Sequence, residues 1–158
     1  MKNKTKMITN GALIAAMYVV LTLVSAMAGL SSGAIQVRIS EALCILPFFM
    51  PEAVWGLFAG CIISNLITGC ALWDVVFGSI ATLIGAVVTA KLKNRWLLPV
   101  PAIISNMVII PLVLIKVYGL SESWWYLVLT VGAGEIISCG ILGQFLYSAW
   151  GKVIKRKS

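Results

Sequence analysis

Residues 123–150, SWWYLVLTVGAGEIISCGILGQFLYSAW, decide the fold of this chain, because the whole stretch contains a single charged side chain, Glu135. A helix needs about 20 apolar residues to cross the hydrocarbon core of a bilayer, which is about 30 Å thick. This stretch is longer than one crossing requires. We therefore expect it to form a membrane-spanning helix.

The rest of the chain has the same character. Of its 158 residues, 61% are hydrophobic and 11% are charged, whereas an average soluble domain is about half apolar and roughly a quarter charged. Six crossings use roughly 120 residues, so we expect one all-α membrane domain over residues 1–158, a bundle of six transmembrane helices, and no second domain. The predicted spans cover residues 8–30, 39–50, 51–70, 73–90, 97–117 and 123–150.

The second predicted span, residues 39–50, is short for a crossing. Twelve helical residues at about 1.5 Å rise cover about 18 Å, so either this helix is short or its loop enters the membrane. Charge favours six crossings. With the N-terminus inside, ten of the twelve Lys and Arg residues fall in cytoplasmic segments, as the positive-inside rule requires. With five crossings, both the KLKNR loop at 91–95 and the basic C-terminal tail would lie outside.

These charges predict a multi-pass protein of the cell membrane with both termini in the cytoplasm. The formal net charge of +7 therefore marks topology and not nucleic-acid binding, since the basic residues sit at the ends of apolar runs. Small residues recur every four positions at Gly56, Gly60 and Ser64, a spacing that lets membrane helices pack closely. The sequence has no internal repeat, so it gives no support to an inverted-repeat carrier.

The composition argues against an enzyme. Histidine is absent, which removes imidazole chemistry, and the five acidic residues are too dispersed for a carboxylate-rich metal cage. The chain also has no GxxxxGK[ST] nucleotide-binding loop. We expect no metal, no cofactor and no ATPase activity of its own. The cysteines show no metal-ligand spacing and are Cys44, Cys61, Cys70 and Cys139.

Polar residues within and beside the spans point to a small-molecule site. Glu135 lies near the middle of the last span, where an ionised carboxylate costs roughly 3 kcal/mol or more unless it faces a polar cavity. Simpler roles stay open: an interhelical hydrogen bond for Glu135, a local ion pair between Arg38 and Glu41, and an N-cap for Asp74. Taken together, these groups describe a pocket between helices. Its further polar candidates inside spans are Asn65 and Asn106.

Three segments carry a family resemblance: GAIQVRISEALCILPFFMPEAVWGLFAGCIISNL at 33–66, WDVVFGSIATLIGA at 73–86 and AGEII at 133–137. They resemble the QueT family, whose members are substrate-binding subunits (S-components) of energy-coupling-factor (ECF) importers. The resemblance covers essentially the whole chain. It implies an S-component bundle that binds its ligand near the outer face, a transmembrane coupling subunit and two cytoplasmic ATPases as partners, and a queuosine precursor of the 7-deazaguanine type as substrate. Ala12 and Ala16 are similar to the AxxxA pattern through which S-components dock on the coupling subunit.

The polar residues suit such a substrate. A guanine-like edge offers an N1 hydrogen and an exocyclic amine, which one carboxylate accepts in a charge-assisted pair. The carbonyl at position 6 needs a donor, an aminomethyl cation would need a second carboxylate, and a flat ring needs a stacking wall, although Trp73 also fits an interfacial aromatic belt. The expected substrate-binding residues are Glu41, Glu135, Arg38, Asp74, Asn65, Asn106, Trp73 and Gln36.

Three other functions stay open. The chain could be an S-component for another vitamin, because polar residues in a pocket do not name a ligand. It could be a stand-alone carrier or channel in which the intramembrane charges form an ion path. A small membrane enzyme, such as a lipid phosphotransferase, would need several acids near a metal, and here the acids are dispersed along the chain.

Overall fold

The computed structural model describes residues 4–30 and 35–155, with side chains up to Trp150. Every element of regular structure in these two ranges is helical. In chain order the elements are α1 (Lys4–Met27), η1 (Ile39–Ile45), α2 (Leu46–Phe49), α3 (Ala53–Ile67), α4 (Leu72–Thr89), η2 (Arg95–Leu97), α5 (Val100–Lys116), α6 (Trp124–Glu135), η3 (Ile136–Leu142) and α7 (Gly143–Lys155).

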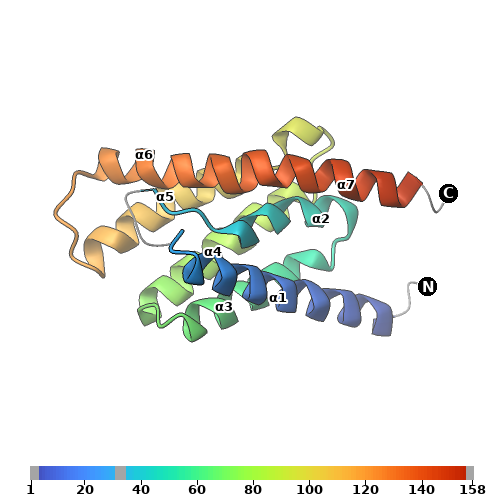
Figure 1. Ribbon diagram of the computed structural model, residues 1–158, viewed down its shortest axis with the longest axis horizontal. Helices are drawn as coiled ribbons and strands as arrows, with labels where there is room; N and C mark the ends of the chain where they lie inside the picture. The colour runs from blue at the N-terminus through green and yellow to red at the C-terminus, as the bar shows by residue number, and fades with distance from the viewer. Residues whose placement is uncertain (1–3, 31–34, 156–158) are drawn as a thin grey trace.

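The elements join into six helical stretches, as predicted. Four are long and apolar enough to cross a bilayer, namely Lys4–Met27, Leu72–Thr89, Arg95–Lys116 and Trp124–Trp150. Two shorter apolar stretches, Ile39–Phe49 and Ala53–Ile67, complete the bundle. The start of α1 and the end of α7 lie at the same end of it, which we call the terminal end (Figure 1). An even number of crossings requires this arrangement, and the cytoplasmic location of that end stays a prediction.

The first helix is shifted towards the N-terminus relative to its predicted range. It begins at Lys4, because basic side chains can extend a helix into the headgroup region, where they stay solvated. It ends at Met27, where Gly29 adopts a left-handed φ of 70°. The Leu30 amide then donates to the Ser25 carbonyl at 3.0 Å and the Gly29 amide to the Ala26 carbonyl at 3.0 Å, a Schellman cap. Residues 31–34, between the first and second predicted spans, lie outside the described residues.

The second stretch is short, one of the two possibilities that its sequence allowed. Ile39–Ile45 is a 3₁₀-helix and only Leu46–Phe49 is α-helical. With about 2.0 Å rise for a 3₁₀-helix and about 1.5 Å for an α-helix, the stretch spans about 20 Å, less than the hydrocarbon core. The residue before it, Arg38, is extended, with φ −109° and ψ 108°.

Close helix packing at small residues is confirmed between α1 and α3. A Cβ atom added at Gly56 would lie 2.6 Å from the Gly11 carbonyl oxygen, and one added at Gly60 would lie 2.8 Å from Tyr18 Cβ. The two backbones approach each other at these glycines. The same device brings α4 against α5, where a Cβ at Gly85 would lie 2.8 Å from the Ala102 Cα.

The apolar core lies towards the terminal end. It combines η1 and α2 with the first turns of α3 and α5, and Leu43, Ile45, Leu57 and Leu98 are each at most 2% exposed. The aromatic rings of Phe49 and Tyr147 add to it, with centroids 5.2 Å apart. Large apolar side chains on the outside of α1, α4, α5 and α6 remain exposed, as expected for surfaces that face lipid.

Candidate functional site

A small cavity in the middle of the bundle collects most of the polar residues predicted from the sequence. It has a volume of about 40 Å³, enough for a few water molecules, and we call it the inner cavity. Gln36, Arg38, Glu41, Asn106 and Glu135 all line it. The remaining lining residues are Cys61, Gly78, Thr82, Ile110 and Val131.

Glu135 is the last residue of α6, where the helix widens into the π-helical turns of η3. Asn106 on α5 donates to Glu135 Oε1 at 2.9 Å, and the Cys139 thiol donates to Glu135 Oε2 at 3.2 Å. Both carboxylate oxygens therefore accept a hydrogen bond from the protein. Insertions of π-helix in α-helices occur frequently at functional sites, and this one begins directly after Glu135, which lines the inner cavity.

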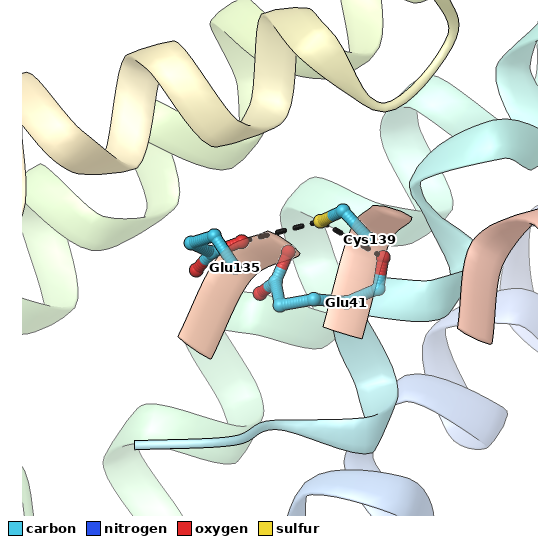
Figure 2. A group of neighbouring side chains, drawn as sticks. All are labelled: Glu41, Glu135 and Cys139. Carbon is cyan, nitrogen blue, oxygen red and sulfur yellow. Dashed lines mark hydrogen bonds between the residues drawn. The ribbon is translucent and has the colours of Figure 1, made fainter. Parts of the chain in front are cut away.

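Glu41 faces Glu135 from the opposite wall. It lies on η1, is 5% exposed, and its Oε1 accepts a hydrogen bond from the Tyr18 hydroxyl of α1. Figure 2 shows the two carboxyl groups turned towards each other, with Cys139 beside them. Two carboxylates that meet in a low-dielectric interior repel each other unless a cation or proton donors lie between them. The pair is therefore suited to a ligand that brings positive charge or several N–H groups.

The same three side chains have the geometry of a possible metal site. Glu41, Glu135 and Cys139 each bring one ligand atom within 4.8 Å of the others. Those atoms already take part in hydrogen bonds: the single Cys139 S–H is shared between Glu135 Oε2 at 3.2 Å and the Glu41 carbonyl oxygen at 3.4 Å. The geometry is thus that of a hydrogen-bonded cluster, and the expectation that no metal binds stays a prediction.

Arg38 supplies the positive charge of the inner cavity. Its Nη1 donates to Asn65 Oδ1 at 3.2 Å, and its guanidinium lies within electrostatic range of Glu41 and Asp74. Asn65 is only 1% exposed and lies behind Arg38, so it holds the guanidinium and does not line the cavity. With one cation against three carboxyl groups, the region as a whole favours ligands with donor groups or positive charge.

Two larger cavities adjoin the inner one on the side away from the terminal end, and we call them the outer cavities. One, of about 450 Å³, is lined by Gln36, Arg38, Asp74 and Tyr118 among others. The other, of about 360 Å³, shares Gln36 and reaches Glu122. Ligand pockets in proteins usually measure about 300–1,000 Å³. The outer cavities therefore have the size of a small-molecule site, and Gln36 connects them to the inner cavity.

Tyr118 and Asp74, which both line the first outer cavity, are hydrogen-bonded to each other. The Tyr118 hydroxyl donates to Asp74 Oδ2 at 2.9 Å and accepts a hydrogen bond from the Ala71 amide at 3.1 Å. Burial and the neighbouring Asp74 raise the pKa of the Tyr118 phenol above its ordinary value of 10.0. The phenol thus keeps its proton at neutral pH and continues to donate to the Asp74 carboxylate.

One predicted residue lies apart from the others. Trp73 is 59% exposed and stacks on Phe77 with ring centroids 5.9 Å apart, and it lines none of the three cavities. Its neighbour Asp74 is buried and does line an outer cavity. Successive residues of a helix point about 100° apart, so the two side chains cannot share one face.

Three residues that hydrogen-bond to the carboxyl groups of the site were not predicted: Tyr18, Cys139 and Tyr118. A signal for Tyr18 exists, because Tyr18, Thr22 and Ser25 recur at helical spacing and form the polar, buried face of an otherwise apolar α1. Cys139 follows Glu135 by four residues, which also places the two on one face. Tyr118 lies in a loop, and nothing in its sequence neighbourhood indicates its contact with Asp74.

The two alanines expected to dock on a partner lie on the surface. Ala12 and Ala16 are both exposed on α1, so neither packs inside the bundle. Ala12 also lines a groove of about 580 Å³ between α1 and α3, together with Ile8, Ala15 and Trp55. The small side chains leave the α1 backbone accessible there.

Comparison with known proteins gives one family and one relative. A family model described as QueT transporter matches residues 8–152. A curated protein of Lactococcus lactis subsp. cremoris (strain MG1363), named queuosine precursor transporter QueT, is 38% identical over 84 residues, which cover 52% of this chain and 48% of the relative. The matched segment thus spans about half the length of that protein. No solved structure matches.

Proposed function

This chain belongs to the QueT transporter family, and from that membership we propose that it is the substrate-binding membrane subunit of an importer for a queuosine precursor or related 7-deazaguanine. Its long apolar helices make it a multi-pass membrane protein. The name of the Lactococcus relative supports this substrate class. The observation that carries the proposal is the pair of facing carboxyl groups, Glu41 and Glu135, in a polar cavity inside an apolar bundle.

The hydrogen-bonding groups of the inner cavity match the edge of a guanine-like base. Glu135 or Glu41 accepts the N1 hydrogen and the exocyclic amine together, a charge-assisted pair that is stronger than a neutral one. Arg38, Gln36 and the Asn106 amide supply donors for the carbonyl at position 6. A ligand edge with two or three N–H groups also relieves the repulsion between the two carboxyl groups.

The sizes of the cavities suggest how the ligand lies. A bicyclic base is larger than the inner cavity of about 40 Å³ but fits the outer cavities of about 450 and 360 Å³. The base then occupies an outer cavity with its donor edge directed at the inner one. A cationic aminomethyl group on the base would find a second carboxylate at Asp74.

Mass spectrometry of the small molecule that co-purifies in mild detergent tests the substrate class. We expect a 7-deazaguanine, and we expect 7-deazaguanine to compete for the site where 7-deazaadenine does not, because the adenine edge has an acceptor at N1 and a donor at position 6. A co-purified molecule without the N1–H and amine donor pair would instead indicate an S-component for another vitamin.

The proposal includes coupling to an ECF module, since the family resemblance implies it and the exposed Ala12 and Ala16 support it. In this arrangement the face with the two alanines packs on a transmembrane coupling subunit, and two cytoplasmic ATPases supply the energy. Small residues four apart allow a partner helix to approach closely. The alternative is a stand-alone carrier that works without partners.

Tryptophan substitutions separate the two possibilities. We expect Ala12→Trp or Ala16→Trp to abolish both co-purification with the coupling subunit and uptake in cells, while ligand affinity of the isolated chain stays within about twofold of the wild type. Met17→Trp is the control, because Met17 is 37% exposed on the same helix and points about 140° away from Ala12 and about 100° away from Ala16. Normal uptake with tryptophan at both alanines, or uptake by the purified chain alone in liposomes, would contradict coupling.

A further inference from the structure

Two site residues come from a segment that is not helical. Residues 35–38, which we call the strap, lie directly before η1, and Gln36 and Arg38 of this segment line the inner cavity. Backbone without helical hydrogen bonds is tolerated at membrane depth only where protein buries it and satisfies its polar groups. The position of the strap therefore depends on what holds its backbone.

Helix α6 holds the middle of the strap at a glycine. A Cβ atom added at Gly134 would lie 2.0 Å from the Gln36 carbonyl oxygen and 3.0 Å from its carbonyl carbon. These are backbone atoms, which cannot turn aside as the tip of a side chain can. Gly140, in the same long helix, differs: a Cβ there would lie 3.7 Å from Ile136 Cγ2, an ordinary van der Waals contact.

Two serines hold the end of the strap. The Arg38 amide donates to Ser138 Oγ of η3 at 3.2 Å, and the Ile39 amide donates to Ser25 Oγ of α1 at 2.9 Å. Both hydroxyls are at most 1% exposed. The strap is thus fixed between α1 on one side and the α6–η3 helix on the other.

The sequence G-E-x-x-S-C at residues 134–139 interleaves two pairs of residues four apart. Gly134 and Ser138 contact the backbone of the strap, whereas Glu135 lines the inner cavity and accepts a hydrogen bond from Cys139. The same helical turn therefore carries the Glu135 carboxylate and contacts the strap that carries Arg38.

From this geometry we propose that Gly134 is a positioning residue of the substrate site: it sets the depth of the strap and so the placement of Gln36 and Arg38. The identity of the ligand in this inference rests on the proposed function. Any β-carbon at position 134 needs at least 3.0 Å from the Gln36 carbonyl oxygen where the glycine leaves 2.0 Å, so the strap must move by about 1 Å. A displacement of this size exceeds the roughly 0.5 Å within which a binding constellation must be held.

The first measurement needs no ligand. Hydrogen exchange of the detergent-solubilised protein, followed by mass spectrometry of a peptide covering residues 35–41, reports the protection of the Arg38 and Ile39 amides. We expect Gly134→Ala to speed exchange in this peptide at least tenfold and Gly140→Ala to leave it unchanged. Unchanged exchange in Gly134→Ala would overturn the proposal whatever the ligand is.

The second measurement is a binding titration with 7-deazaguanine. We expect Gly134→Ala to weaken binding at least tenfold and Gly140→Ala less than twofold. Because Gly134 acts through the strap, adding Gly134→Ala to Arg38→Ala should weaken binding by less than threefold more, whereas adding it to Asn106→Ala should multiply the two losses. Multiplication in both double variants would reduce Gly134 to a general structural role and overturn the proposal.

A milder variant covers the case in which Gly134→Ala does not fold. Ser138→Ala removes only the hydroxyl that accepts from the Arg38 amide, and we expect it to speed exchange at residues 35–41 and to weaken binding three- to tenfold, again without multiplying the loss of Arg38→Ala. If the wild type does not bind 7-deazaguanine at all, the proposed function fails, while the exchange experiment still decides the role of Gly134.

Discussion

The two ends of the bundle differ in how they fill their interior. Towards the terminal end, apolar side chains pack with at most 2% exposure at Leu43 and Ile45 of η1, Leu57 of α3 and Leu98 just before α5. From the middle of the bundle to the other end, the interior contains the inner cavity, the two outer cavities and the strap. The comparison indicates that the packed half supplies stability, and it supports the proposal that the hollow half accommodates ligand.

The largest effect on stability should come from the packed half. Leu57→Ala leaves a cavity around a side chain that is 1% exposed, and we expect it to lower the free energy of unfolding by about 2–5 kcal/mol. Ligand affinity of the folded fraction should stay unchanged. Denaturant titration in detergent measures the first quantity and a binding isotherm the second. Leu129→Ala, at a side chain that is 68% exposed, serves as the control.

A comparable loss in the hollow half should appear in ligand binding and not in stability. We expect Glu135→Gln to weaken binding by about 1.5–3 kcal/mol, because it removes a charge-assisted acceptor from a low-dielectric cavity. Glu52→Gln, whose side chain lines the α1–α3 groove at the terminal end and none of the three cavities, should have almost no effect. A binding isotherm on solubilised protein compares the two. Equal, near-zero effects would remove Glu135 from the site and with it the division between the halves.

The smallest predicted effect concerns single hydroxyl groups in the two halves. Tyr118→Phe removes the donor to Asp74 in the outer cavity and should weaken binding by about 0.5–1.5 kcal/mol. Tyr147→Phe, in the packed half, should leave binding unchanged. The Tyr118 effect should be constant from pH 6 to about pH 9, because its raised pKa keeps the phenol protonated there. A larger loss of ligand affinity from Tyr147→Phe than from Tyr118→Phe would contradict the proposed division between the packed half and the hollow half.

The helices could be predicted to within a few residues because each is an apolar run ended by Gly, Pro or basic residues. The 3₁₀ geometry of Ile39–Ile45 could not. Its apolar pattern suits an α-helix equally, and contacts distant in sequence decide: Thr22 on α1 donates to Ser40 at 2.8 Å, and Tyr18 donates to Glu41. These hydroxyls stabilise a tighter, longer helix than local preference indicates.

The candidate site was predictable where a residue contradicts its surroundings. A carboxylate in a span stands out from its neighbours, and Glu135 does line the inner cavity. Contacts made by residues that are ordinary in a membrane helix cannot be recognised in the sequence. Gly134 resembles the other small residues of a membrane helix until the Gln36 backbone is found against it. Trp73 shows the converse, since a tryptophan near a span end suits both a stacking wall and the lipid interface.

The π-helical segment Ile136–Leu142 has a consequence for the phase of the long last helix. Each of its residues advances around the axis by less than the roughly 100° of an α-helix, so the faces of α6 and α7 are offset by an angle that accumulates along the segment. A helical wheel drawn with one constant angle over residues 124–150 would superimpose side chains that point in different directions. Deleting one residue from the segment would rotate α7 about its axis and turn Tyr147 away from Phe49, although every side chain on α6 kept its direction.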